Sequence, residues 1–178
     1  MTSTTKKLFS HVCNEDVFCK IHEEHSKNLY NFIYYKYGNT VDAGDKVQEA
    51  FIKLWELCKD VSPEKAKSFL FTIARNLSLN EIKHINIKLK YQKNAAGFKN
   101  NADKNNPEFI LEEKQFLEKY QKALAGLTEA QRVAFLMNRA EGKKHKEIAE
   151  ILGISKKAVE KRIYGALEKL RKDIKEIP

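Results

Sequence analysis

Apolar residues recur every three or four positions along most of this chain, a spacing that places them on one face of an α-helix. A first helical stretch is expected over residues 16–37, where a Gly-Asn pair follows the last apolar position. Asp42 can cap a second helix that ends near residue 59. Pro63 fits the first turn of a third helix that continues to about residue 90. These three stretches predict one compact helical bundle.

The helical pattern stops between residues 91 and 107, where Asn, Lys, Ala and Gly replace the large apolar residues. That composition is typical of a flexible linker. Helical spacing resumes at Phe109 and continues to the C-terminus, whereas residues 1–13 are polar and unpatterned and predict a frayed leader. The expected fold class is all-α, with two small helical domains joined by the linker.

Composition and charge narrow the class of partner. The chain has 178 residues, of which 42% are hydrophobic, and contains only 7 Gly and 3 Pro, so it can bury real cores in helices. Its formal net charge of +9 favours a polyanionic partner. Residues 12–60 carry nine acidic against six basic side chains, whereas residues 75–104 carry seven basic against two acidic. The first segment therefore suits a protein partner and the second suits phosphate.

Three cysteines, Cys13, Cys19 and Cys58, form no CxxC pair and leave one without a partner. A disulfide framework is therefore not expected, and a reducing cytoplasm fits best. The chain has no apolar run of about 20 residues and no apolar signal core. We expect a soluble cytoplasmic protein.

The sequence gives no indication of catalysis. It has no phosphate-binding glycine loop, and no Ser-His-Asp set or carboxylate pair stands in a context that would support chemistry. Cys19, His22 and His25 invite a metal hypothesis, but spacings of three residues turn successive side chains around a helix, so the three would not converge on one ion. We expect no enzyme activity, no metal and no cofactor.

Residues 146–164 have the pattern of a helix-turn-helix. Ala149 is small where two helices must cross closely, and Gly153 can take the positive φ that ends the first helix. Ile154 packs beneath the turn, and Ser155 caps the second helix. These positions agree with one turn geometry, although an ordinary helical hairpin with a solvated charged face is the alternative.

The second helix of this motif has an apolar side and a basic side. The expected core positions are Val159, Ile163, Ala166, Leu167 and Leu170. The side expected to face a DNA major groove carries Lys156, Lys157, Glu160, Lys161 and Tyr164. Arg162, Lys169 and Arg171 flank that side as expected phosphate contacts.

Three further segments resemble a known family. Residues 45–55 (DKVQEAFIKLW) and 69–76 (FLFTIARN) are similar to conserved region 2 of bacterial sigma factors. Residues 126–135 (GLTEAQRVAF), together with the helix-turn-helix that follows, resemble region 4. Two regions in this order with a short linker resemble the extracytoplasmic-function (ECF) group of the sigma-70 family, over about residues 14–172.

The resemblance implies a division of labour along the chain. Region 2, at 14–92, would bind core RNA polymerase and the −10 promoter element; a linker would occupy 93–107; and region 4, at 108–178, would read the −35 element. The implied polymerase-binding residues are Asp45, Gln48, Glu49 and Trp55. The implied −10 residues are Asn76, Asn80, Lys83 and His84. The implied −35 residues are Lys156, Lys157, Glu160, Lys161, Arg162 and Tyr164.

The resemblance also implies partners: core RNA polymerase, promoter DNA and an anti-sigma factor, with no stable homo-oligomer. Read from the residues alone, Asn76, Asn80 and Lys83 share one helical face, where amide and amine groups can meet bases or phosphates. The chain departs from the family pattern at Phe69, where Trp is usual, and at Ala158, where Thr is usual. Asn80 stands where Asp is frequent. The choice of promoter sequence is the property that these departures affect most.

Two other protein classes share some of these features. A conventional transcriptional regulator would use the same helix-turn-helix as a dimer on a palindrome, with a sensing or dimerisation module in place of residues 45–76. A helical adaptor that binds only protein would leave the basic excess of residues 75–104 unused. The first domain therefore discriminates among the three classes.

Overall fold

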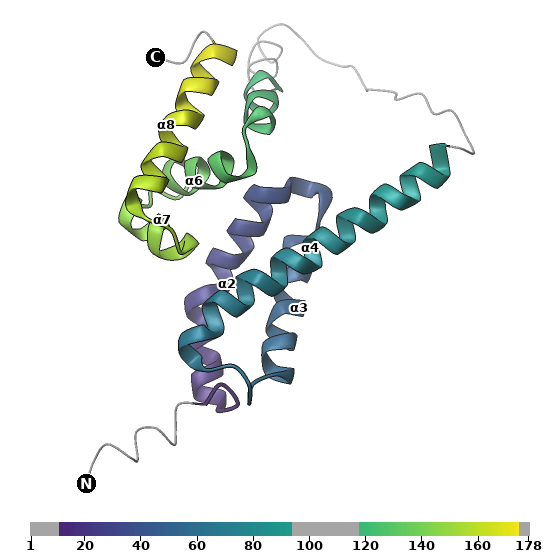
Figure 1. Ribbon diagram of the computed structural model, residues 1–178, viewed down its shortest axis with the longest axis vertical. Helices are drawn as coiled ribbons and strands as arrows, with labels where there is room; N and C mark the ends of the chain where they lie inside the picture. The colour runs from purple at the N-terminus through teal and green to yellow at the C-terminus, as the bar shows by residue number, and fades with distance from the viewer. Residues whose placement is uncertain (1–10, 94–117, 175–178) are drawn as a thin grey trace, which may run out of the picture. The chain divides into compact units, whose positions relative to one another are not determined.

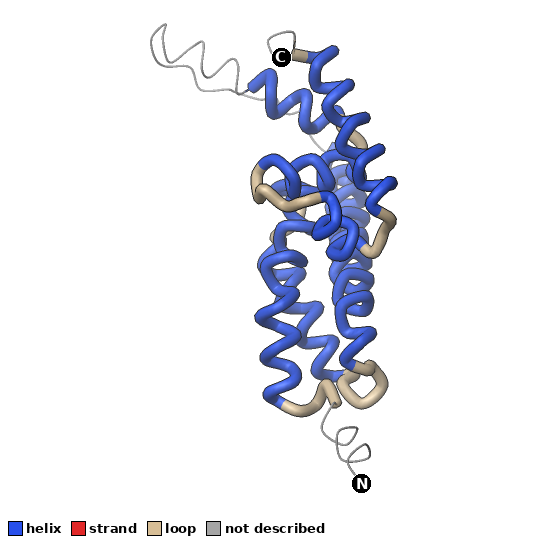
Figure 2. Tube along the Cα trace, turned by 90° about the vertical axis from the view of Figure 1, so that its left-hand side faces the viewer, coloured by secondary structure: helices blue, strands red, loops and turns tan. Residues whose placement is uncertain are grey.

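The structure, a computed structural model, describes residues 11–93 and 118–174, with backbone alone for 88–93. It is built from helices and short connections, and the described residues contain no strand (Figures 1 and 2). The all-α fold class is thus confirmed. The chain divides into two compact units, Met1–Lys88 and Leu89–Pro178, each with its own core.

Helix α2, Glu15–Tyr37, begins at a side-chain cap. The Asn14 side chain accepts hydrogen bonds from the backbone N–H groups of Asp16, at 2.9 Å, and Val17, at 3.4 Å. These bonds satisfy two of the donors that a helix start leaves free. The helix ends at Gly38, as its sequence predicts, and a short 3-10 turn, η1 (Gly38–Thr40), leads to the next helix.

Helix α3 (Ala43–Glu56) and helix α4 (Pro63–Lys93), the latter as far as Lys88, complete the first unit. The helices share one core, whose fully buried members are Leu29, Ile33, Leu54 and Leu70, together with Val12. Turns occupy the residues after Glu56, so α3 ends slightly before the position that its pattern predicts. Helix α4 outruns its neighbours, and its C-terminal part extends beyond the bundle (Figure 1).

The start of the described chain belongs to this bundle. Val12, which the sequence pattern places in a polar leader, has no exposed surface and lies in the core. A single valine in a polar stretch has no periodicity, so its burial has no signal in the sequence. Residues 1–10 of the predicted leader lie outside the described residues.

A disulfide joins Cys13 to Cys58, and the expectation of unpaired cysteines was wrong on this point. The two Cα atoms lie 4.9 Å apart although the residues are separated by 45 positions. The fold brings the start of α2 beside the turn that follows α3, and cysteine spacing in the sequence does not contain that proximity. The third cysteine, Cys19, is free and exposed.

In the second unit, residues 118–126 are helical and lead into α6 (Glu129–Arg139), α7 (His145–Leu152) and α8 (Lys156–Asp173). Thr128 and Gln131 cap α6 reciprocally, each side chain binding the other residue's backbone N–H. Helix α8 packs against both α6 and α7. The core includes Phe135, Ile148, Val159, Ile163 and Leu170. Leu167, expected in the core, is partly buried against it.

The linker predicted at 93–107 lies outside the described residues apart from Lys93. The same holds for the first turns of the helical pattern that resumes at Phe109. The two units are therefore described one at a time.

Candidate protein and nucleic-acid interfaces

Helix α3 presents the residues predicted to bind the polymerase. Its cap is Asp42, whose carboxylate accepts a hydrogen bond from the Asp45 backbone N–H at 3.0 Å. Asp45 in the first turn is favoured by the positive end of the helix dipole. Asp45, Gln48 and Trp55 are exposed, and Glu49 is half-buried. All four predicted residues thus reach solvent from one helix.

An open apolar groove of about 690 Å³ lies between α2 and α3. Gln48 lies at this α2–α3 groove. The apolar and aromatic residues that line the groove are Phe18, His22, Val47, Phe51, Ile52 and Trp55. Trp55 is 47% exposed and Ile52 is 51% exposed. Large apolar side chains with half of their surface in water, beside charged neighbours, are typical of a site for another protein.

Aromatic contacts hold the groove in shape. The ring of Phe18 on α2 meets Trp55 edge-on at 5.1 Å between centroids and Phe51 at 6.0 Å. His22 packs on Phe51 at 4.7 Å. The α2 residues of this groove were not among the predicted site residues. Ile52 could have been predicted from the sequence, since it shares a helical face with Gln48 and Trp55. The contribution of α2 could not, because it depends on tertiary packing.

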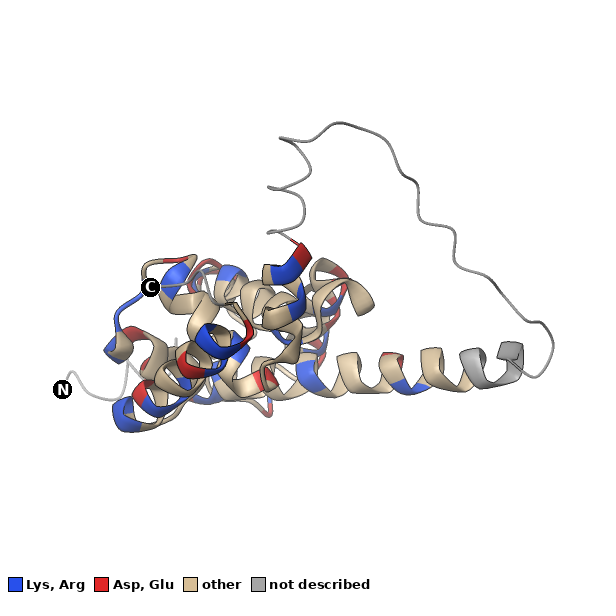
Figure 3. Ribbon diagram, turned by 90° about the horizontal axis from the view of Figure 1, so that it is seen from above, with Lys and Arg blue, Asp and Glu red and all other residues tan. Residues whose placement is uncertain are grey.

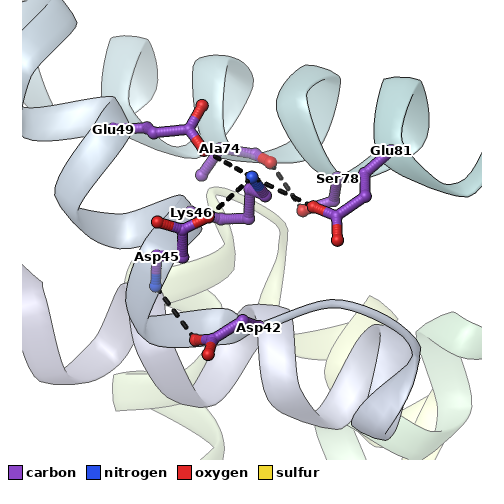
Figure 4. A network of polar contacts seen from close by, with 7 residues as sticks. All are labelled: Asp42, Asp45, Lys46, Glu49, Ala74, Ser78 and Glu81. Atoms are coloured by element: carbon purple, nitrogen blue, oxygen red, sulfur yellow. Dashed lines mark hydrogen bonds and ion pairs between the residues drawn. The ribbon is translucent and has the colours of Figure 1, made fainter. Parts of the chain in front are cut away.

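Lys46 lies behind the predicted polymerase-binding residues and links α3 to α4. It is only 7% exposed, and its ammonium pairs with three carboxylates (Figure 4). The Nζ atom lies 3.0 Å from Asp45 Oδ2 and 3.0 Å from Glu81 Oε2, and it also binds Glu49 Oε1. We call Lys46, Asp45, Glu49 and Glu81 the Lys46 cluster. It includes two of the predicted residues and leaves out Gln48 and Trp55.

The charges of this cluster reinforce one another. Burial alone would lower the pKa of Lys46, but hydrogen bonds from its ammonium to Glu49, Glu81 and Asp45 raise that pKa above its ordinary value. The hydrogen bond between Lys46 and Asp45, together with the attraction of the ammonium, lowers the pKa of Asp45. Lys46 and Asp45 are therefore both ionised at neutral pH.

The residues predicted to meet the −10 element, Asn76, Asn80, Lys83 and His84, all lie on α4 and are all exposed. Their spacing of four, three and one residues puts them on one side of the helix. The other side is buried: Ser78 has no exposed surface, and its hydroxyl donates to the Ala74 carbonyl at 2.7 Å. Phe69 and Ile73, also on α4, pack against the core of the first unit.

The helix-turn-helix has the predicted turn. Gly153 adopts the left-handed conformation, with φ 65° and ψ 36°, and ends α7. The Ile154 backbone N–H then donates to the Ala149 carbonyl at 3.0 Å. The Ser155 hydroxyl accepts a hydrogen bond from the Ala158 backbone N–H at 3.2 Å and so caps α8. Gly153, Ala149 and Ser155 hold the positions that their residue types indicate.

The predicted −35 residues occupy the accessible side of α8. Lys156, Lys157, Lys161 and Tyr164 are exposed, Tyr164 at 66%, and Arg162 is half-buried. Glu160 differs, because its carboxylate faces partners within the protein. Its Oε1 lies 3.6 Å from His145 Nδ1 on α7 and 3.7 Å from Lys156 Nζ. The structure thus brings His145, which was not a predicted site residue, beside this helix.

Basic and acidic residues are interleaved along the helices (Figure 3). Of the basic residues counted over 75–104, only Arg75 and Lys83 have described side chains, so the charge of that segment is judged from the sequence. Over the described ranges, no group of three or more His, Cys, Asp or Glu could hold a metal ion. Within 11–93 and 118–174, no helix has the length and apolarity needed to cross a membrane.

Comparison with known proteins identifies both units. Residues 21–86 match the family model "Sigma-70 region 2", and residues 117–170 match "Sigma-70, region 4". The ECF RNA polymerase sigma factor SigE of Mycolicibacterium smegmatis is 27% identical over 149 residues, which are 83% of this chain and 58% of that protein. The chain thus spans less than two thirds of that relative's length.

A solved structure has a similar fold. It is the sigma factor RpoE in complex with the anti-sigma factor NepR from Bartonella quintana, at 20% identity and a TM-score of 0.53, and the match covers 90% of this chain and 98% of that one. The two family models together match more than half of the chain, in the order that the sequence predicts. The chain therefore belongs to the sigma-70 family, with the two-region organisation of its ECF group.

Proposed function

We propose that this protein binds core RNA polymerase through its first unit and directs transcription initiation at promoters with specific −10 and −35 elements. The observation that carries the proposal is the α2–α3 groove, because its open apolar surface, lined by Gln48 and Trp55, includes the helix that the resemblance to region 2 predicts to bind the polymerase. Desolvating these side chains against a partner would contribute to binding.

DNA recognition is assigned to α4 and α8. Asn76, Asn80, Lys83 and His84 would meet the −10 element, where exposed amides can hydrogen-bond to unpaired bases. On α8, Lys156, Lys157, Glu160, Lys161 and Tyr164 would enter the −35 major groove, with Arg162 at a phosphate. The matches to regions 2 and 4 support this order.

The proposed partners follow from the family. An anti-sigma factor is proposed as the inhibitor, because the solved sigma factor of similar fold is bound to one. A factor that acts with RNA polymerase works where the chromosome is, so we propose a cytoplasmic protein. Chemistry is left to the polymerase, and the active form is a monomer.

The polymerase-binding assignment is tested by replacing Trp55 with Ala in the full chain and measuring the affinity for core RNA polymerase and promoter-dependent run-off transcription. We expect core affinity to fall by about tenfold or more, because a half-buried aromatic anchor is lost. Tyr34→Ala is the control, since Tyr34 is an aromatic residue 44% exposed on α2 that does not line the groove.

Equal affinities of the Trp55→Ala variant and the unaltered chain would refute the groove as the polymerase site. Binding of the chain alone, as a dimer, to a palindrome without polymerase would favour the conventional-regulator class instead.

A further inference from the structure

Lys46 occupies an unusual position for a lysine. Lysine is seldom buried unless it is paired, and here one ammonium serves three carboxylates that come from two helices. Asp45 and Glu49 lie on α3, one turn apart, and Glu81 lies on α4 (Figure 4). Glu81 directly follows the exposed Asn80 in the sequence. Lys46 therefore joins the predicted polymerase-binding helix to the predicted DNA-binding helix through an ion pair, in addition to their shared core.

In the Lys46 cluster the positive charge is buried and the negative charges lie nearer the surface. The Lys46 side chain is 9% exposed, whereas its carboxylate partners Asp45, Glu49 and Glu81 are 58%, 39% and 34% exposed. Three carboxylates around one ammonium leave the cluster net negative, and the excess faces solvent. Without the ammonium, three like charges would lie close together and repel one another, so Asp45 and Glu49 would leave their present positions.

We propose that Lys46 is a positioning residue for polymerase binding: anchored on α4 through Glu81, it fixes the carboxylates of Asp45 and Glu49 in the arrangement that receives cationic groups of the polymerase. The inference rests on the proposed function. Positioning by Lys46 fixes the geometry of Asp45 and Glu49 before the partner binds, so binding does not incur the conformational entropy cost of ordering them. It also assigns Glu81, which would not touch the polymerase, a share in the affinity.

The test compares full-length chains carrying Lys46→Met, Lys46→Arg and Glu81→Gln. Affinity for core RNA polymerase is measured at low and at moderate salt, at a temperature where circular dichroism shows each variant folded. Lys172→Met is the matched control, because it also removes a lysine from an ion pair, with Glu168 at 3.0 Å, at an exposed site in the second unit. Trp55→Ala is measured alongside.

We expect Lys46→Met to weaken core binding by roughly tenfold at low salt and by less at moderate salt, since the lost contribution is electrostatic. Lys46→Arg restores the positive charge and should recover part of the loss. A residue that only filled space would show the reverse order, because Met matches the volume of Lys better than Arg does. Lys172→Met should bind as the unaltered chain does.

Equal binding by the Lys46→Met and Lys172→Met variants, or Arg performing no better than Met, overturns the inference. If Lys46→Met does not fold, Glu81→Gln decides: weaker core binding supports the positioning role, and unchanged binding overturns it. The outcome for Trp55→Ala distinguishes failure of the proposed polymerase site from failure of the positioning role of Lys46. If Trp55→Ala binds normally, the proposed polymerase site is wrong; if it binds weakly while the Lys46 variants do not, only the positioning role fails.

Discussion

At the scale of single residues, His25 links acidity to stability. It is half-buried on α2, and this burial lowers its pKa, as does the charge of Lys67, while Glu24 acts in the opposite direction. The unfolded chain therefore binds a proton more readily than the folded one over the range just below the ordinary histidine pKa of about 6.5. The contribution of neutral His25 is complete above that range and is lost as the pH falls through it.

We predict that the first unit loses stability between pH 8 and pH 5 and that His25→Gln reduces this loss. His84→Gln, at an exposed position on α4, should leave the pH dependence as it is. Urea midpoints at the two pH values measure the effect. An identical pH dependence for His25→Gln and the unaltered chain would exclude His25 as a contributor.

Gly153 is constrained by its backbone. Its φ of 65° is disfavoured for other residues, while a Cβ placed there meets nothing within 4 Å. Gly153→Ala should therefore lower the free energy of unfolding of the second unit by about 1–2 kcal/mol through backbone strain alone. Gly126→Ala, where the nearest atoms are 4.0 Å from the added Cβ and φ is not positive, is the control. Thermal unfolding that shifts equally in both variants would contradict this explanation.

At the scale of elements, the turn before α8 was accessible from the sequence because its signals are local. Gly153 and Ser155 each act within a few residues of their own position, and so does Asp42 before α3. The role of Lys46 could not be predicted from the sequence, since lysine is ordinarily a surface residue and its partner Glu81 comes from a different helix. The α2 side of the groove was hidden for the same reason.

Glu160 shows how an element's context changes an expectation read from its face. His145 Nδ1 and Lys156 Nζ lie 3.6 Å and 3.7 Å from its carboxylate, so a base would contact Glu160 beside two nitrogen groups of the protein. We predict that Glu160→Ala shifts the preference at one −35 position, because a good base contact contributes about 1–3 kcal/mol of discrimination. Arg162→Ala should weaken binding to all sequences and reduce the salt slope by about 1.

A selection over randomised −35 elements, carried out with each variant, measures both effects. An unchanged selected sequence for Glu160→Ala together with an altered one for Arg162→Ala would show that the assignment of the two roles is reversed.

At the scale of the whole molecule, the expectation of two domains came from the break in the sequence pattern, because loss of apolar periodicity marks where a core ends. The disulfide had no such signal. Three cysteines permit several pairings, and only the fold selects Cys13 with Cys58. The sequence likewise does not predict which promoter is chosen. The residues on α4 and α8 indicate which helix faces meet DNA, but not which bases those faces contact.

We predict that Cys58→Ser destabilises the first unit, by up to roughly 4 kcal/mol for a loop closed over 45 positions, because the unfolded chain gains freedom. Cys19→Ser should have little effect, as Cys19 is free and exposed. Urea unfolding with and without a thiol reductant measures this. The reduced unaltered chain should match Cys58→Ser, and a reductant effect that persists in Cys58→Ser would indicate a different cause.

The Cys13–Cys58 bond also determines how the molecule responds to mechanical tension. The covalent ring contains α2 and α3, whereas α4 continues from its edge. Force applied at the two ends of the chain therefore passes across the sulfur bridge, and the ring between its attachment points bears none of the load. Roughly 160 Å of chain, at about 3.6 Å per residue, stays slack until the bridge is reduced. Within the first unit, helix α4 carries the pull, and the groove beside Trp55 lies inside the shielded ring.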